Sequence, residues 1–101
     1  DISGVLENLI YLELIRRGYK VGIGVINGGE IDFIAEKQNE KIYLQVCYML
    51  SGDTVVQREF GSLESINDNY RKIVLTLDKF FPSDRNGIER MYIPDFLLHK
   101  T

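Results

Sequence analysis

The chain has 101 residues, of which 45% are hydrophobic and 27% are charged, values that are ordinary for one soluble globular domain. Its net charge of -3 and pI of about 5.1 argue against a dedicated nucleic-acid binder, whose surface is usually basic. One Cys and one His exclude an internal disulfide and a Cys/His zinc site. No apolar run approaches the ~20 residues that span a bilayer, and we expect a cytoplasmic protein. The chain does not open with Met, so we also expect it to be a fragment of a longer protein.

The first predicted element is a helix over residues 3–17. Ser3 is the predicted N-cap, and Gly18 is the glycine expected just beyond the last turn. Apolar side chains lie on nearly all sides of this helix, so we expect it to be covered on more than one side. One face carries Val5, Leu9 and Leu12, and the other side carries Ile10 and Leu14.

Three strands are predicted next, over residues 19–26, 30–36 and 42–50. Short turn-forming segments join them as hairpins, so the three strands should be antiparallel. In the second strand Ile31, Phe33 and Ala35 occupy alternate positions, and we expect them to share one face. The third strand is apolar almost throughout, which is typical of a strand buried on both faces in the centre of a sheet.

A second helix is predicted to begin with Asp53 as its N-cap and to end near Ile66. Its apolar face carries Val56, Phe60, Leu63 and Ile66. A strand over residues 72–77, an edge strand over 88–93 and a short helix over 95–99 follow. Because a helix joins the third and fourth strands, these should be parallel, with a right-handed crossover. The sequence therefore predicts one α/β domain over residues 1–101, with a mixed sheet flanked by a helix on each face.

Three polar residues stand where the pattern predicts burial, and an unpaired buried charge is costly. Glu7 has no cation three or four positions away along its helix. Asp32 lies in the middle of a strand, where Asp is disfavoured. Gln45 interrupts the apolar third strand. In ordinary hairpin register Asp32 and Gln45 come close, and Glu7 is expected to reach them from the helix.

Two carboxylates and an amide oxygen form a ligand set that suits Mg²⁺ or Mn²⁺. Such ions activate water in phosphodiester cleavage. The alternative interpretation is structural: Asp32 and Gln45 hydrogen-bond to one another and to backbone, while Glu7 braces the sheet.

A local basic cluster, formed by Arg16, Arg17 and Lys20, is the predicted nucleic-acid-binding surface. The alternative is a solvated helix end. Glu13 has both arginines three and four positions ahead of it, which is typical of a solvated surface charge with local partners.

At these residues the chain resembles the PD-(D/E)xK, or restriction-endonuclease-like, nuclease superfamily. There a helix Glu, a strand Asp and a (D/E)-x-K motif on the next strand form the active site. Glu7, Asp32, Gln45 and Cys47 stand at the matching positions, and the order αβββαβ over residues 3–77 matches the core of that fold. The resemblance implies a three-layer core with an extra C-terminal strand and short helix. It also makes Glu7, Asp32 and Gln45 the candidate catalytic and metal-binding residues.

A closer resemblance covers nearly the whole chain and concerns the C-terminal domain of unknown function in a family of prokaryotic AAA-type ATPases. The similar segments are residues 6–14, 16–19, 30–33, 42–46, 58–60 and 68–70. This resemblance implies an upstream ATPase domain in the same protein as a partner. Gly22-x-Gly24 lacks the spacing of a phosphate-binding loop, so ATP is assigned only to that upstream domain.

One departure from the nuclease motif bears on activity. Cys47 stands where the superfamily has Lys, and a thiol supplies no fixed positive charge. Gln45 keeps a carbonyl oxygen but removes a negative charge where Asp or Glu is usual. A relocated lysine would have to come from elsewhere, and Lys20 and Lys41 are the candidates.

Three hypotheses follow. The first is a degenerate, non-catalytic nuclease-fold accessory domain of an ATPase, with a DNA-associated or regulatory role. The second is a weak Mg²⁺-dependent DNA nuclease. The third is a protein-interaction module without a nucleic-acid role, which the acidic pI favours over direct DNA binding.

Overall fold

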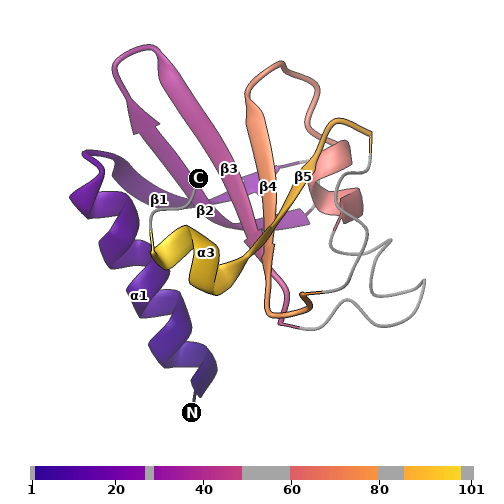
Figure 1. The fold of residues 1–101 in the computed structure, drawn as a ribbon. Helices are drawn as coiled ribbons and strands as arrows, with labels where there is room; N and C mark the ends of the chain where they lie inside the picture. The colour runs from indigo at the N-terminus through magenta and orange to yellow at the C-terminus, as the bar shows by residue number, and fades with distance from the viewer. Residues whose placement is uncertain (1, 27–28, 49–59, 80–85, 99–101) are drawn as a thin grey trace.

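The computed structural model describes residues 2–26, 29–48, 60–79 and 86–98. Its helices and strands are α1 (Ile2–Arg16), β1 (Lys20–Ile26), β2 (Gly29–Lys37), β3 (Glu40–Val46), β4 (Arg71–Thr76), β5 (Glu89–Tyr92) and α3 (Ile93–Leu97). Residues 60–64 are also helical. These elements follow the predicted order (Figure 1). The predicted cap at Asp53 and the predicted core residue Val56 lie outside the described residues.

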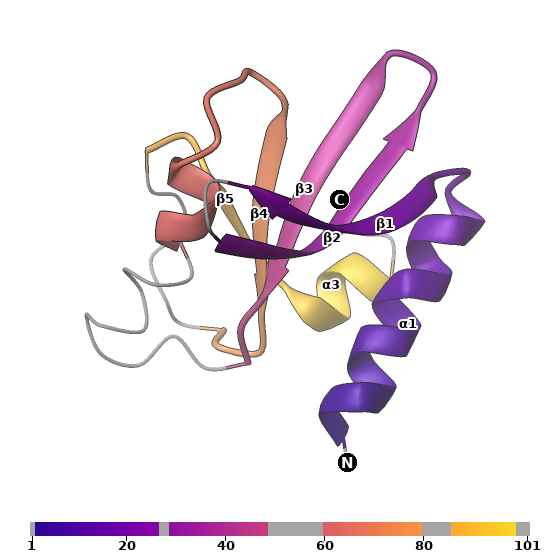
Figure 2. The same ribbon diagram turned by 180° about the vertical axis from the view of Figure 1, so that it is seen from behind.

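The strands form one sheet of five, in the order β1-β2-β3-β4-β5. The pairs β1/β2 and β2/β3 are antiparallel, whereas β3/β4 and β4/β5 are parallel. The predicted antiparallel hairpins and the parallel pair across the helix are therefore confirmed. Helices α1 and α3 lie on one face of the sheet and residues 60–64 on the other, as Figures 1 and 2 show from opposite sides. The domain is thus α/β, with a mixed sheet flanked by helices.

Two apolar cores lie against the two faces of this sheet. The first core joins α1 and α3 to the sheet through Ile10, Leu14, Tyr19, Phe33, Ala35, Ile42, Leu44, Ile73, Leu75, Ile93 and Phe96. The second core packs residues 60–66 on the opposite face through Ile31, Tyr43, Cys47, Phe60, Leu63, Ile66, Val74 and Ile88. The central strand β3 contributes to both, as its apolar sequence predicts.

A β-bulge in β2 changes which face its residues point to. Gly22 of β1 pairs with Ile34, but Gly24 pairs with Ile31, so β2 has one extra residue between these pairs. As a result Ile31 packs in the second core, whereas Phe33 packs in the first. The expectation that these two residues share one face is wrong, because strand alternation is interrupted at the bulge.

The end of α1 follows its sequence closely. Gly18 has φ of 94°, the left-handed conformation in which glycine is preferred. Its N–H donates to Ile15 O at 2.9 Å, and the Tyr19 N–H donates to Leu14 O at 3.0 Å, the pair of bonds that defines a Schellman motif. The other end differs from prediction: the helix already includes Ile2, so Ser3 lies inside it and is not its N-cap.

Glu13 is buried at 7% exposure, which overturns its prediction as a solvated surface charge. Its carboxylate accepts from Arg16 at 2.8 and 3.0 Å and from Arg17 Nε at 2.6 Å. These bonds and charges, led by Arg16, outweigh the opposing effect of burial and lower the pKa of Glu13 from 4.5 to about 2. Local spacing predicted the pairing correctly, but the burial arises from the packing of α1 on the sheet.

The two apolar sides of α1 differ in burial. Ile10 and Leu14 are buried in the first core, whereas Val5, Leu9 and Leu12 are exposed. The expectation that the helix is covered on more than one side is therefore not met by the described residues. None of the described helices has the length and apolar character needed to cross a membrane.

We predict that Glu13→Gln lowers the free energy of unfolding by about 1.5–3 kcal/mol at pH 7, because it weakens charge-assisted bonds to two arginines. The depressed pKa of Glu13 makes this contribution complete above about pH 4.5, and it is lost as the pH falls towards 2. Urea denaturation at pH 7 and at low pH measures both effects. The exposed Glu30→Gln serves as the control, and an equal loss in both variants would contradict the prediction.

Candidate functional site

The candidate site lies where the ladder between β2 and β3 ends. Backbone pairing runs from Lys37 to Phe33 of β2, and Phe33 is opposite Leu44. Beyond this point the side chains of Asp32 and Gln45 bond to the backbone of the neighbouring strand in place of backbone–backbone hydrogen bonds. The Asp32 N–H donates to Gln45 Oε1 at 2.9 Å. In return, the Val46 N–H donates to Asp32 Oδ2 at 2.8 Å.

Gln45 makes a second bond to the same strand, through its Nε2, which donates to Glu30 O at 3.2 Å. Both ends of its amide are therefore used by the β2 backbone, and its side chain is buried at 7% exposure. The predicted approach of Asp32 and Gln45 is confirmed. The contacts match the structural alternative, in which these residues bond to one another's strands and to backbone.

Glu7 is exposed, so the expectation that it is buried is wrong, because α1 packs on the sheet through another side. It reaches this region through Tyr48, a residue that the sequence analysis missed. The Tyr48 hydroxyl lies 2.9 Å from Ser3 O and 3.0 Å from Glu7 Oε2. Burial first, then the bond and charge of Glu7 and the charge of Asp32, raise the pKa of Tyr48 to about 12. Glu7 and Asp32, the two predicted carboxylates, therefore both raise the pKa of the Tyr48 hydroxyl. The signal in the sequence was an aromatic side chain with a polar tip near the end of the predicted third strand.

Cys47 lies in the second core, at 8% exposure. Its backbone N–H donates to Leu75 O at 2.8 Å, which continues the pairing with β4. The neighbouring Tyr48 instead packs against the first core, on the other face of the sheet. The position that the resemblance matches to the nuclease lysine thus holds a thiol among apolar side chains, directed away from the Tyr48 face.

Two of the three predicted magnesium or manganese ligands already accept hydrogen bonds from backbone. The oxygen of Gln45 accepts from Asp32 N–H, and Asp32 Oδ2 accepts from Val46 N–H. Within the described ranges, no three His, Cys, Asp or Glu side chains are grouped so as to hold a metal ion. Glu7 lies within hydrogen-bond distance of the Tyr48 hydroxyl, whereas Asp32 influences that hydroxyl through its charge. Metal binding by Glu7, Asp32 and Gln45 stays a prediction.

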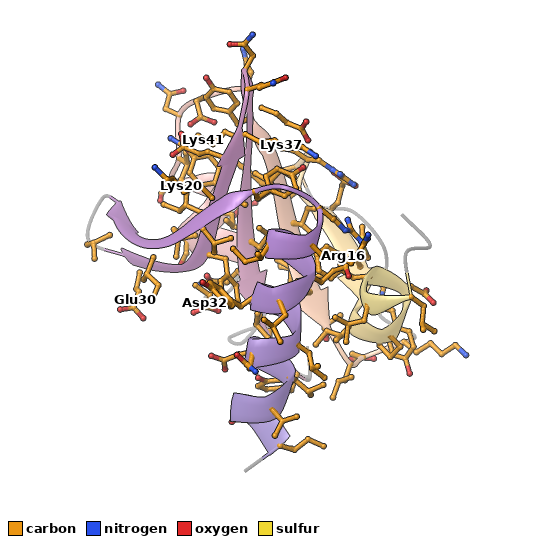
Figure 3. The ribbon with its side chains drawn as sticks, turned by 90° about the vertical axis from the view of Figure 1, so that its left-hand side faces the viewer. Arg16, Lys20, Glu30, Asp32, Lys37 and Lys41 are labelled. Carbon is orange, nitrogen blue, oxygen red and sulfur yellow. The ribbon has the colours of Figure 1, made fainter. Side chains whose placement is uncertain are left out.

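The two lysines considered as replacements lie elsewhere on the sheet. In the strand register, Lys20 of β1 and Lys41 of β3 stand opposite Glu36 of β2, one on each side. At about 3.3 Å per residue, that row lies roughly 13 Å along β2 from Asp32. Figure 3 shows Lys20 and Lys41 near one end of the sheet and Asp32, with Glu30, nearer the other. The suggestion that either lysine serves the Asp32 region is therefore wrong, because the register separates them.

The predicted basic cluster contains two arginines with structural contacts. Arg17 donates from its Nη2 to Phe96 O at 2.8 Å, and its guanidinium lies 4.2 Å from the centroid of the Phe96 ring. Arg16 is paired with Glu13. Lys20 is exposed on β1 and lines a pocket of about 270 Å³ that includes Lys41. Nucleic-acid binding by Arg16, Arg17 and Lys20 stays a prediction.

We predict that Glu7→Gln lowers the pKa of Tyr48 from about 12 towards its usual value near 10. Removing the carboxylate charge makes the phenolate less unfavourable. Titration of ¹³C-labelled tyrosine by NMR measures this. Tyr19 is the internal control, because burial and Glu40 raise its pKa to about 12 independently of Glu7. A Tyr48 titration that does not respond to the variant would show that Glu7 has no influence on it.

We also predict that Gln45→Glu destabilises the fold by about 1–3 kcal/mol, because the variant loses the donor to Glu30 O and places a carboxylate against that carbonyl. Gln38→Glu makes the same change on the exposed turn between β2 and β3 and should stay within about 0.5 kcal/mol of wild type. Chemical denaturation of the two variants gives the comparison. Equal stabilities would mean that the amide of Gln45 does not hold β2.

No known family model matches the chain. It is similar to an uncharacterized protein of Haemophilus influenzae, with 42% identity over 93 residues, which covers 92% of this chain and 22% of that protein. It is also similar to an uncharacterized protein of Methanocaldococcus jannaschii, with 30% identity over 95 residues, covering 90% of this chain and 21% of that protein. The chain therefore spans about a fifth of the length of the curated relatives it matches, and neither name states an activity.

Proposed function

We propose that this domain is a degenerate, non-catalytic member of the restriction-endonuclease-like fold that serves as an accessory domain of a cytoplasmic AAA-type ATPase. Its role is DNA-associated or regulatory. The observation that carries the proposal is the use of Gln45: both ends of the amide at the nuclease metal-ligand position hold the backbone of β2.

The arrangement of elements supports the nuclease-like fold. α1 is followed by three antiparallel strands, a helical segment and a parallel strand, which agrees with the αβββαβ core. Asp32 and Gln45 stand together where β2 and β3 separate, and Glu7 approaches from α1. This arrangement supports the assignment of a helix Glu and two strand residues to the motif.

The same residues support a non-catalytic role. Nuclease chemistry of this class requires a metal-activated water and a positive charge near the phosphate. Here Gln45 stabilises the end of a strand pair, and Cys47 fills an apolar core. Replacing the thiol by lysine would place a charge among Ile31, Tyr43 and Val74, which is costly without a partner.

The lengths of the relatives support an accessory role. Both continue for about four fifths of their length outside the matched region. We assign nucleotide hydrolysis to that larger part, in agreement with the resemblance to ATPase C-terminal domains. The described domain would then regulate the ATPase by binding to it.

The proposal predicts no metal-dependent cleavage of supercoiled plasmid or single-stranded DNA with Mg²⁺ or Mn²⁺. Asp32→Asn is the matched control, because its amide oxygen still accepts from Val46 N–H while the charge is lost. Nicking by the wild-type protein that disappears in Asp32→Asn would overturn the non-catalytic assignment. Nicking that is equal in both would indicate a contaminating nuclease.

A second arm of this experiment separates DNA association from regulation. DNA contact through the exposed Lys20 should weaken steeply as salt rises, because each neutralised phosphate releases counterions. Lys20→Glu should then weaken binding, whereas Lys79→Glu, the same charge reversal at an exposed residue beyond the end of β4, should weaken it less. If Lys20→Glu leaves DNA binding unchanged, the surface around Lys20 does not contact DNA.

A further inference from the structure

Four large apolar side chains form an exposed stripe along α1. Ile2, Val5, Leu9 and Leu12 are exposed by 72%, 58%, 42% and 50%. Ile2 and Val5 are three residues apart, as are Leu9 and Leu12, and four residues separate Val5 from Leu9. We call this set the outer stripe of α1. Contiguous apolar surface of this kind marks an interaction site more often than isolated exposed residues do.

The spacing of the outer stripe is that of a helix-packing seam. At 100° per residue, its members fall within roughly 80° of one another on the helix. Their intervals of three, four and three residues are those of the a and d positions of a heptad. The buried side of α1, with Ile10 and Leu14, is a separate stripe that already packs on the sheet. The outer stripe is therefore a second, independent packing face on the same helix.

The position of α1 places part of this stripe beyond the sheet. In both ribbon views the N-terminal half of α1 extends past the ends of the neighbouring strands (Figures 1 and 2). Ile2 and Val5 lie on this half. The outer stripe itself has no charged member, so it suits an apolar partner surface and not an ionic one.

We propose that the outer stripe is a docking face for an amphipathic helix from the remaining part of the same polypeptide. The relatives supply the reason for choosing this occupant, because about four fifths of their length lies outside the matched region. A tethered segment is present at high effective concentration, so it occupies such a face ahead of free partners. The inference does not require that the larger part be an ATPase.

The test uses thiol labelling in the full-length natural polypeptide. Leu9→Cys is compared with Gln38→Cys, which lies on the exposed turn between β2 and β3. Modification by N-ethylmaleimide is followed at each site by peptide mass spectrometry, which separates these thiols from Cys47. If the stripe is docked, Leu9→Cys should react at least about tenfold more slowly than Gln38→Cys in the native protein, because reaction requires the docked helix to open. Equal rates would overturn the proposal.

A second measurement distinguishes the occupant. Protection within one polypeptide is independent of protein concentration, whereas protection that is lost on dilution would assign the stripe to a second copy and overturn the proposal. Val5→Cys provides an independent reporter. Introducing Leu9→Asp and Leu12→Asp together should restore fast labelling at Val5→Cys, and protection that persists would show that the outer stripe is not the contact.

Discussion

The exchange of hydrogen bonds between Asp32 and Gln45 is the interaction on which the centre of this domain depends. Regular pairing of β2 with β3 ends at Phe33 and Leu44, and the backbone groups beyond this point need new partners. Asp32 accepts from the backbone of β3, while Gln45 bonds to the backbone of β2 at two points. The strands can therefore separate without leaving these polar groups unpaired.

This constraint also decides what chemistry the site supports. An amide whose two ends hold a strand is a structural element, and the carboxylate beside it is partly used in the same way. Glu7 and Asp32 instead act together on the Tyr48 hydroxyl, whose pKa they raise along with burial. The contacts that hold β2 therefore engage the residues that the proposed nuclease-like motif would use for metal binding, which is why we favour an accessory role.

The helix α1 combines an internal and an external function. One side packs on the sheet through Ile10 and Leu14, and the buried Glu13 joins Arg16 and Arg17 at its end. Arg17 continues this link to Phe96 of α3. The outer stripe makes no contribution to either core of the described domain. One side of α1 therefore packs within the domain, and in our proposal the other side packs against the rest of the polypeptide.

Periodicity and turn residues in the sequence were sufficient to predict the order of elements, the antiparallel hairpins, the central position of β3 and the glycine that ends α1. These features depend on interactions between near neighbours in the chain. The approach of Asp32 to Gln45 also followed from simple register. The bulge, the burial of Glu13, the role of Tyr48 and the distance of Lys20 from Asp32 were decided only by tertiary structure. Each depends on how α1 and the strands pack together, and a local pattern has no information about which distant surface covers a given residue.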